Sequence, residues 1–233
     1  MTPLDTTPFD TTPFDNRPFD SVIETVEQLA DLYHAPSQLV QAKVRSGLDA
    51  GSATFISTAP FLLIGTTGAD GRNDVSPRGG PSGFVKVLDD NYVAIPDLNG
   101  NNLIDTIRGI VETGRAGVIF VVPGQDETLR LNGQAWVTTD SSILDRWNDE
   151  LRRPKSAIVV RADQVFVHCA KAFRRSHLWD PATWAQYEGA PDCANILETQ
   201  GLLGDVDASV VRSSLEEGYV AGLDYDRPEP VTT

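Results

Sequence analysis

Hydrophobic and polar residues alternate most regularly along Thr128–Thr138. One set of positions is apolar or small and consists of Leu129, Leu131, Gly133, Ala135 and Val137. The intervening positions are Thr128, Arg130, Asn132, Gln134 and Trp136, which are polar except for the tryptophan. A period of two residues is typical of a β-strand that buries one face. The segment therefore predicts a strand whose other face, which carries a guanidinium group, is available to a ligand.

Other short hydrophobic runs predict further strands around this one. Residues 61–67 and 118–122 read as buried strands because apolar residues dominate them. Gly68-Ala69-Asp70-Gly71 and Asp89-Asp90-Asn91 contain the residues that tight turns favour. Shorter runs predict strands at residues 73–76, 84–88 and 92–95, and a last strand or strand pair at residues 157–160 and 165–168.

Helical spacing occurs at both ends of the chain and once within the series of strands. A helix at residues 101–112 would carry Ile104, Ile107 and Ile110 on one face. Ser21 and Glu24 have the spacing of a capping box, which predicts a helix start. Further helices are predicted at residues 36–47, 52–59, 140–151 and 207–219. We expect the N-terminal helices to pack against the strands.

This order of elements favours a mainly β fold with flanking helices, of the α+β class. A parallel sheet would need a helix between nearly every pair of strands, and those helices are missing. About six strands with one inserted helix therefore predict a small antiparallel barrel. We place this single domain at residues 21–225, after an arm at residues 1–20 and before a frayed tail at residues 226–233.

The arm contains a tandem repeat, TTPFD-TTPFD-NRPFD, at residues 6–20. A proline in each copy prevents a continuous helix. We expect a disordered or extended arm. The alternative is that Phe9, Phe14 and Phe19 dock on another surface.

Composition restricts the partners and the compartment. The chain of 233 residues has 33 acidic and 19 basic residues and a formal net charge of −14. Nucleic acid and anionic membranes are not expected partners, because clustered cations bind them. Cys169 and Cys193 are expected to be free, buried thiols. No secretory signal and no apolar run of ~20 residues is recognisable, so we expect a soluble cytoplasmic protein.

No motif of a serine hydrolase, a zinc protease or a nucleotide-binding loop is present. The three histidines, His34, His168 and His177, are scattered, so no metal site is expected. His168 ends an apolar strand, and we expect it to be hydrogen-bonded within the core.

The remaining polar features indicate a site for a small anionic ligand. Arg78 lies in Ser76-Pro77-Arg78-Gly79-Gly80, where glycine permits close approach of the backbone and arginine suits phosphate. Asn101 and Asn102 stand at the predicted helix start, where N–H groups either bind an anion or are simply capped. Arg130 and the basic cluster of Lys171, Arg174 and Arg175 are further candidates. Each of these residues could equally be a solvated surface group.

Four sequence motifs are more informative in their order than any one residue. They are Asp74-Val75-Ser76-Pro77-Arg78-Gly79, Gly100-Asn101-Asn102, Pro123-Gly124 with Glu127-Thr128-Leu129-Arg130-Leu131-Asn132-Gly133, and His168-Cys169-Ala170-Lys171-Ala172. In this order they resemble the flavin-binding split-barrel proteins of the pyridoxamine 5′-phosphate oxidase type, and a bacterial subgroup in particular. The resemblance covers about residues 36–185.

The resemblance implies a six-stranded antiparallel split barrel of Greek-key type, which forms a homodimer with two FMN molecules at the interface. It implies that Arg78, Ser76, Asn101 and Asn102 surround the phosphate. The other cofactor-binding residues that it implies are Ile95 and Asp97 along the flavin ring, Thr128 and Arg130 as polar contacts, and Lys171, Arg174 and Trp179 from the partner subunit.

One departure from the family pattern concerns the phosphate. The bacterial subgroup that the chain resembles has a basic residue after the paired asparagines, whereas this chain has Leu103, and Arg108 is the residue that could compensate. The residues that would bind the phosphate of a pyridoxamine phosphate substrate are not recognisable.

The resemblance therefore implies an FMN-dependent oxidoreductase that acts on an unknown small molecule. One alternative is a flavin-binding or redox-sensing protein without turnover. The other is a split barrel with haem or a deazaflavin, and for haem only His34 and His177 could be the axial ligand.

Overall fold

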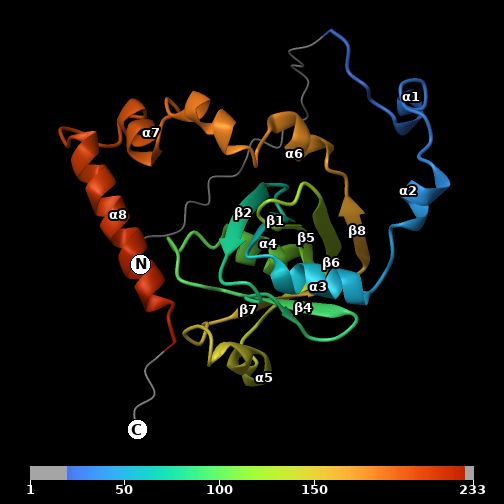
Figure 1. Ribbon diagram of the computed structural model, residues 1–233, viewed down its shortest axis with the longest axis horizontal. Coiled ribbons are helices and arrows are strands. Elements are labelled where there is room, and N and C mark those ends of the chain that lie inside the picture. Colours follow the sequence, from blue (N-terminus) through green and yellow to red (C-terminus); the bar gives the residue numbers. More distant parts are fainter. Residues whose placement is uncertain (1–19, 229–233) are drawn as a thin grey trace.

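The computed structural model of this chain describes residues 20–228, and the phenylalanines of the N-terminal repeat lie outside them (Figure 1). Antiparallel strands form the centre of the structure. They are β1 (Phe61–Thr67), β2 (Asn73–Gly79), β3 (Lys86–Val87), β4 (Tyr92–Pro96), β5 (Arg115–Val121), β6 (Thr128–Thr138), β7 (Ala157–Arg161) and β8 (Gln164–His168).

The strands lie in the order β2-β1-β5-β6-β7-β4-β3, with β8 paired to β6. Every pairing is antiparallel, which confirms the mainly β, α+β prediction. The predicted number of about six strands was wrong, since the described residues contain eight. The total was too low although each strand overlaps a predicted segment, since residues 84–88 contain the short β3 and the strand pair allowed at residues 157–168 is present as β7 and β8.

Strand β6 connects two halves of the sheet. One half consists of β2, β1, β5 and β8, and the other consists of β7, β4 and β3. Its first half pairs with β5 and β8, and its second half pairs with β7. Asn132 is opposite Gln164 and Ala135 is opposite Val160, so the three residues 161–163 lie opposite only two residues of β6, Gly133 and Gln134. This arrangement is a β-bulge, which bends the strand and increases its twist.

The bulge is held by Asp163. Its carboxylate pairs with the guanidinium of Arg161 and accepts a hydrogen bond from the backbone N–H of Gln134 at 3.1 Å. These contacts, led by the one with Arg161, lower the pKa of the Asp163 carboxyl. The backbone of this bulge crosses β6 close to Gly133, because a Cβ built on Gly133 would meet the carbonyl oxygen of Arg161.

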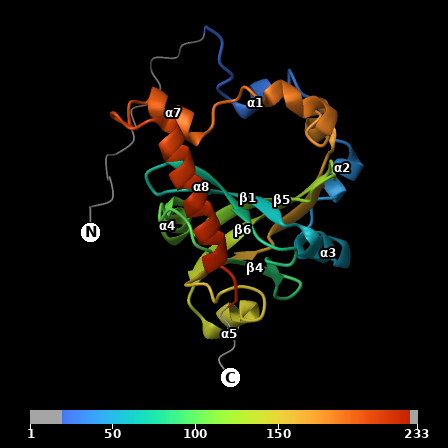
Figure 2. The ribbon, with the colours of Figure 1, turned by 60° about the vertical axis from the view of Figure 1, so that its left-hand side comes forward.

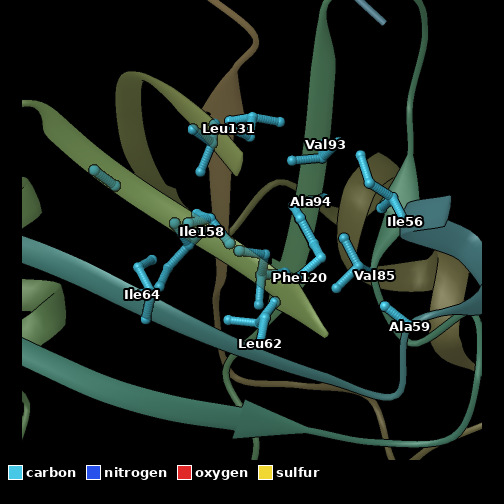
Figure 3. Close-up of a cluster of buried hydrophobic side chains, with 14 of the residues drawn as sticks. Ile56, Ala59, Leu62, Ile64, Val85, Val93, Ala94, Phe120, Leu131 and Ile158 are labelled. Atoms are coloured by element: carbon cyan, nitrogen blue, oxygen red, sulfur yellow. The ribbon is translucent and has the colours of Figure 1, made fainter. Parts of the chain in front are cut away.

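The core lies between the two halves of the sheet. Leu62 and Ile64 from β1, Phe120 from β5 and Ile158 from β7 are at most 1% exposed and point toward one another (Figure 3). The predicted alternation of β6 is confirmed, because Leu129, Leu131, Gly133 and Ala135 are buried. Thr128 was predicted to lie on the polar face that is available to a ligand, but it is buried, with only 4% exposure.

Helices surround the sheet on several sides (Figures 1 and 2). They are α1 (Val26–Leu29), α2 (Gln38–Ala42), α3 (Ala50–Thr58), α4 (Asp105–Thr113), α5 (Ser141–Leu144), η1 (Asp145–Trp147), α6 (Lys171–Ser176), η2 (Pro181–Tyr187), α7 (Cys193–Thr199) and α8 (Ala208–Tyr225). The predicted helix at residues 140–151 is thus the shorter pair α5 and η1. The predicted terminal helix is α8, with Asp207 as its N-cap.

The N-terminal helices differ most from the prediction. The capping box is formed by Thr25 and Gln28, not by Ser21 and Glu24. Neither α1 nor α2 has a buried residue, and both stand away from the sheet (Figure 1). The prediction that these helices pack on the strands was therefore wrong for α1 and α2 within one chain.

Three side chains predicted to be buried are exposed. His168 lies at the end of β8, where the sheet is open to solvent, so it is not a core histidine. Cys169 and Cys193 are free, as predicted, but both are exposed. Among the described residues, no helix is long and apolar enough to cross a membrane.

Candidate functional site

A cavity of ≈ 460 Å³ lies where several segments of the chain meet. Its walls are the end of β2, the loop from Asp97 to Ile104, residues 152–155 and the last turn of α8. Apolar side chains cover part of its surface, and they are Phe84, Leu98, Leu103, Ile104, Ile107 and Leu223. This size and mixed lining suit an organic ligand.

The charges around this cavity differ from those of the chain as a whole. Four basic residues line it, Arg78, Arg152, Arg153 and Lys155, against the two acidic residues Asp97 and Asp226. The protein as a whole has a net charge of −14. A local excess of cations in an acidic protein favours an anionic group at this place.

The basic residues are not equally available to a ligand. Arg153 is paired with Asp145 at 2.8 Å and also donates to the hydroxyl of Ser141. Arg78 is half-buried and, within residues 20–228, its side chain donates to the carbonyl of Pro77 alone, at 2.8 Å. Among the described residues, neither Arg78 nor Lys155 has a carboxylate partner. These two side chains can therefore bind an anion without breaking an ion pair.

Asn101 and Asn102 line the cavity, but they do not begin a helix as predicted. The backbone N–H of Leu103 donates to Oδ1 of Asn101 at 2.9 Å, and Asn102 has a positive φ of 61°. Asparagine favours such local turns, which compete with helix formation. Helix α4 begins at Asp105, and its N-cap Ile104 offers no side-chain hydrogen bond.

Ser76 and Ile95, which were also predicted to contact the cofactor, do not line the cavity. The hydroxyl of Ser76 donates to Asp74, and Thr106 of α4 donates to the same carboxylate. Ile95 is a core residue with 0% exposure. The neighbouring Pro96 and Asp97 do reach the cavity.

The other predicted residues gather elsewhere, around the start of β6, the end of β8 and α6. Arg174 pairs with Asp126 at 2.9 Å, and the indole of Trp179 donates to the carbonyl of Gln125 at 2.8 Å. Arg130 lies over the ring of Phe166, with 5.3 Å to its centroid. Neither these residues nor Thr128 and Lys171 line the cavity. Helix α6 and helix α5 lie on opposite sides of the sheet (Figure 1).

Two groups of residues at the cavity were missed in the sequence. The basic run Arg152-Arg153-Pro154-Lys155 was visible as three cations around a proline in an acidic chain. Tyr225 and Asp226 had no local signal, because they reach the cavity only through the packing of α8. The predicted compensation by Arg108 is not seen, since Arg108 faces Asp105 at 3.8 Å and does not line the cavity.

Asp226 lies within the predicted tail, yet it is fixed in the structure. Its Oδ1 accepts a hydrogen bond from the backbone N–H of Asn99 at 3.1 Å. Burial raises the pKa of its carboxyl, and the hydrogen bond from Asn99 opposes that rise. Within residues 20–228, no cluster of three or more potential metal ligands is found.

Comparison with known proteins gives a family and several structural neighbours. Residues 48–169 match the sequence profile described as pyridoxamine 5′-phosphate oxidase. No curated protein matches the chain. HupZ of Group A Streptococcus is 15% identical, with a TM-score of 0.44 over 52% of this chain and 94% of that chain.

Two other solved structures are similarly distant. An FMN-binding protein from Syntrophomonas wolfei is 9% identical, with a TM-score of 0.40 over 50% of this chain and 82% of that chain. The FAD binding protein from Mycobacterium smegmatis is 15% identical, with a TM-score of 0.37 over 53% of this chain and 97% of that chain.

Proposed function

Because the chain belongs to the pyridoxamine 5′-phosphate oxidase family, we propose that it is an FMN-dependent oxidoreductase acting on a small molecule. The observation that carries this proposal is the cavity beside Arg78, where basic side chains outnumber acidic ones in a strongly acidic protein. FMN combines a flat ring with a phosphate, so it needs both apolar surface and cations.

The residues at the cavity fit such a cofactor. Arg78 and Lys155 have no carboxylate partner among the described residues and would bind the phosphate. Asn101 and Asn102 would offer amide groups to the same phosphate or to the ribityl hydroxyls. Pro96 and Asp97, with the apolar lining, would lie along the flavin.

Bound FMN would supply the redox chemistry by accepting and returning electrons, while the protein orients it and excludes water. The chain's own contribution is then binding and positioning. None of the described histidines lines the cavity within one chain. Phe84, Ile104 and Ile107 would keep water from one side of the ligand.

We further propose that two copies of the chain complete the site. None of the residues Thr128 and Arg130 of β6, Lys171 and Arg174 of α6, and Trp179, which stacks on Phe173 of α6, lines the cavity of its own chain. A second copy is the simplest source of such residues at the open side of a cavity. Helices α1 and α2 expose apolar side chains, among them Val26 at 76% and Leu39 at 79%, as expected of a surface that is covered by a partner.

The dimer is tested with Leu39→Glu. We expect the wild-type protein to have the mass of a dimer in solution and the variant to shift toward the monomer, because a charge at a covered apolar position loses its hydration. Light scattering after gel filtration measures both masses. A wild-type monomer at micromolar concentration would refute the proposed dimer, and Gln41→Glu, an exposed polar position in the same helix, is the control.

The cofactor site is tested with Arg78→Ala. We expect FMN binding to weaken by ~1.5–3 kcal/mol, the loss of a charge-assisted hydrogen bond. This corresponds to a dissociation constant about 10- to 150-fold higher. Riboflavin, which lacks the phosphate, should bind both proteins equally. Fluorescence titration of the flavin measures all four affinities.

Arg108→Ala is the matched control for this experiment, since Arg108 faces Asp105 and not the cavity. FMN affinity should be unchanged in that variant. If Arg108→Ala weakens FMN binding and Arg78→Ala does not, the phosphate lies elsewhere in the protein.

Turnover is tested separately from binding. An oxidoreductase should consume a nicotinamide cofactor steadily in the presence of an electron acceptor. A protein that binds FMN tightly but shows no turnover with a range of donors and acceptors would be a flavin-binding or redox-sensing protein instead.

A further inference from the structure

The last turn of α8 lies outside the part of the chain that matches the family, yet it lines the cavity. The match ends at residue 169, whereas α8 spans Ala208–Tyr225. Leu223, Tyr225 and Asp226 are all part of the cavity wall. Both views show this end of the helix reaching the side of the sheet where α5 lies (Figures 1 and 2).

Arg152 is the residue that α8 engages there. Its backbone N–H donates to the carbonyl of Asp226 at 2.8 Å, and its Nε–H donates to the carbonyl of Tyr225 at 2.7 Å. Its guanidinium also lies over the ring of Tyr225, with 4.2 Å to the centroid. The end of α8 therefore makes three contacts with Arg152.

The same turn is also attached to the loop that follows β4. Asp226 accepts a hydrogen bond from the backbone N–H of Asn99, in the loop that also contains Asn101 and Asn102. A Cβ on Gly222 would lie 3.3 Å from Nδ2 of Asn99, so helix and loop are in close contact. Helix α8 thus connects the asparagine loop with the basic residues 152–155.

We propose that Tyr225 is a positioning residue that holds Arg152 for binding the phosphate of the ligand. Arginine has a planar guanidinium that can stack on an aromatic ring through its face and donate hydrogen bonds to a phosphate from its edge. The three cations Arg78, Arg152 and Lys155 then replace the basic residue that Leu103 does not provide. This inference rests on the proposed function, because it requires a phosphate-bearing flavin in the cavity.

The measured quantity is the ratio of FMN affinity to riboflavin affinity, because only FMN presents the phosphate. Arg152→Ala should reduce this ratio about tenfold or more. Tyr225→Ala should reduce it about 2- to 10-fold through loss of the stacking contact. Tyr225→Phe retains the ring and should leave the ratio unchanged.

A double variant separates positioning from a direct effect of Tyr225. In the Arg152→Ala background, Tyr225→Ala should produce no further change, because the two residues act as one unit. Tyr219→Ala is the matched control, since Tyr219 is an exposed tyrosine of the same helix that does not line the cavity. Arg152→Lys keeps the charge without the planar group and gives a second measure of the same contact if Tyr225→Ala does not fold.

The outcomes distinguish the two proposals. If the wild-type protein binds FMN more tightly than riboflavin and neither Tyr225→Ala nor Arg152→Lys changes the ratio, the role of α8 is refuted while the proposed function stands. The positioning role is also refuted if Tyr225→Ala lowers the ratio equally with and without Arg152. If the wild-type protein binds no FMN, the proposed function is wrong and this inference is wrong with it.

Discussion

Replacing Gly133 with alanine is expected to destabilise the fold by about 3 kcal/mol or more, because the added methyl group has no space. A Cβ at this position would lie well inside van der Waals contact with the carbonyl oxygen of Arg161. That atom belongs to backbone within the β7–β8 bulge, so it cannot turn away as a side chain would. Denaturant unfolding monitored by tryptophan fluorescence measures the change in the free energy of unfolding.

Strand β6 pairs with β5, β7 and β8, and the bulge opposite Gly133 is where β6 leaves β8 and begins to pair with β7. Gly189→Ala is the control, because a Cβ there would meet nothing within 4 Å. A Gly133→Ala protein as stable as the wild type would mean that the bulge does not cross β6 as described.

Replacing Trp147 with alanine is expected to cost about 3–5 kcal/mol, the range for removing a buried aromatic side chain. Trp147 is 0% exposed, and its indole N–H donates to the carbonyl of Phe84 at 2.7 Å. The substitution therefore creates a large void and leaves a buried carbonyl without a donor. The change in unfolding free energy follows from denaturant titration monitored by circular dichroism.

Phe84 connects this residue to the candidate site, since Phe84 is part of the cavity wall. Trp147→Phe keeps most of the volume but loses the donor, and should cost about 1–3 kcal/mol. Trp184→Ala is the matched control, because Trp184 is 52% exposed although its indole also donates to a carbonyl. If Trp147→Ala and Trp184→Ala lower the free energy of unfolding equally, burial of Trp147 does not stabilise the fold as described.

Much of the sheet could be predicted from the sequence, because each strand has its own pattern. The bounds of β6 were predicted correctly as Thr128–Thr138, where apolar and polar positions alternate over eleven residues. The bounds of β1 were equally clear from its apolar run.

Helices were less predictable, since short polar side chains can cap a helix or form a turn. Asn101 and Thr25 are the examples, one forming a turn and the other a cap away from the predicted place.

The candidate site was predictable only in its local parts. Arg78, Asp97, Asn101 and Asn102 were predicted and share one cavity, because each lies at the end of a strand or in the loop that follows. The contact between Arg152 and Tyr225 joins residues 73 positions apart, and no local pattern indicates it. His168 shows the opposite error, since an apolar strand predicts burial but not that its end is open to solvent.

The central claim is that this chain holds FMN, and the most direct test is to identify the cofactor of the purified protein. The protein is incubated with FMN, freed of unbound flavin and denatured, and the released molecule is identified by mass and counted against the protein. We predict a yellow protein that releases FMN in an equal amount to the chain. A protein that remains colourless after this treatment, or that releases haem, would contradict the proposed function.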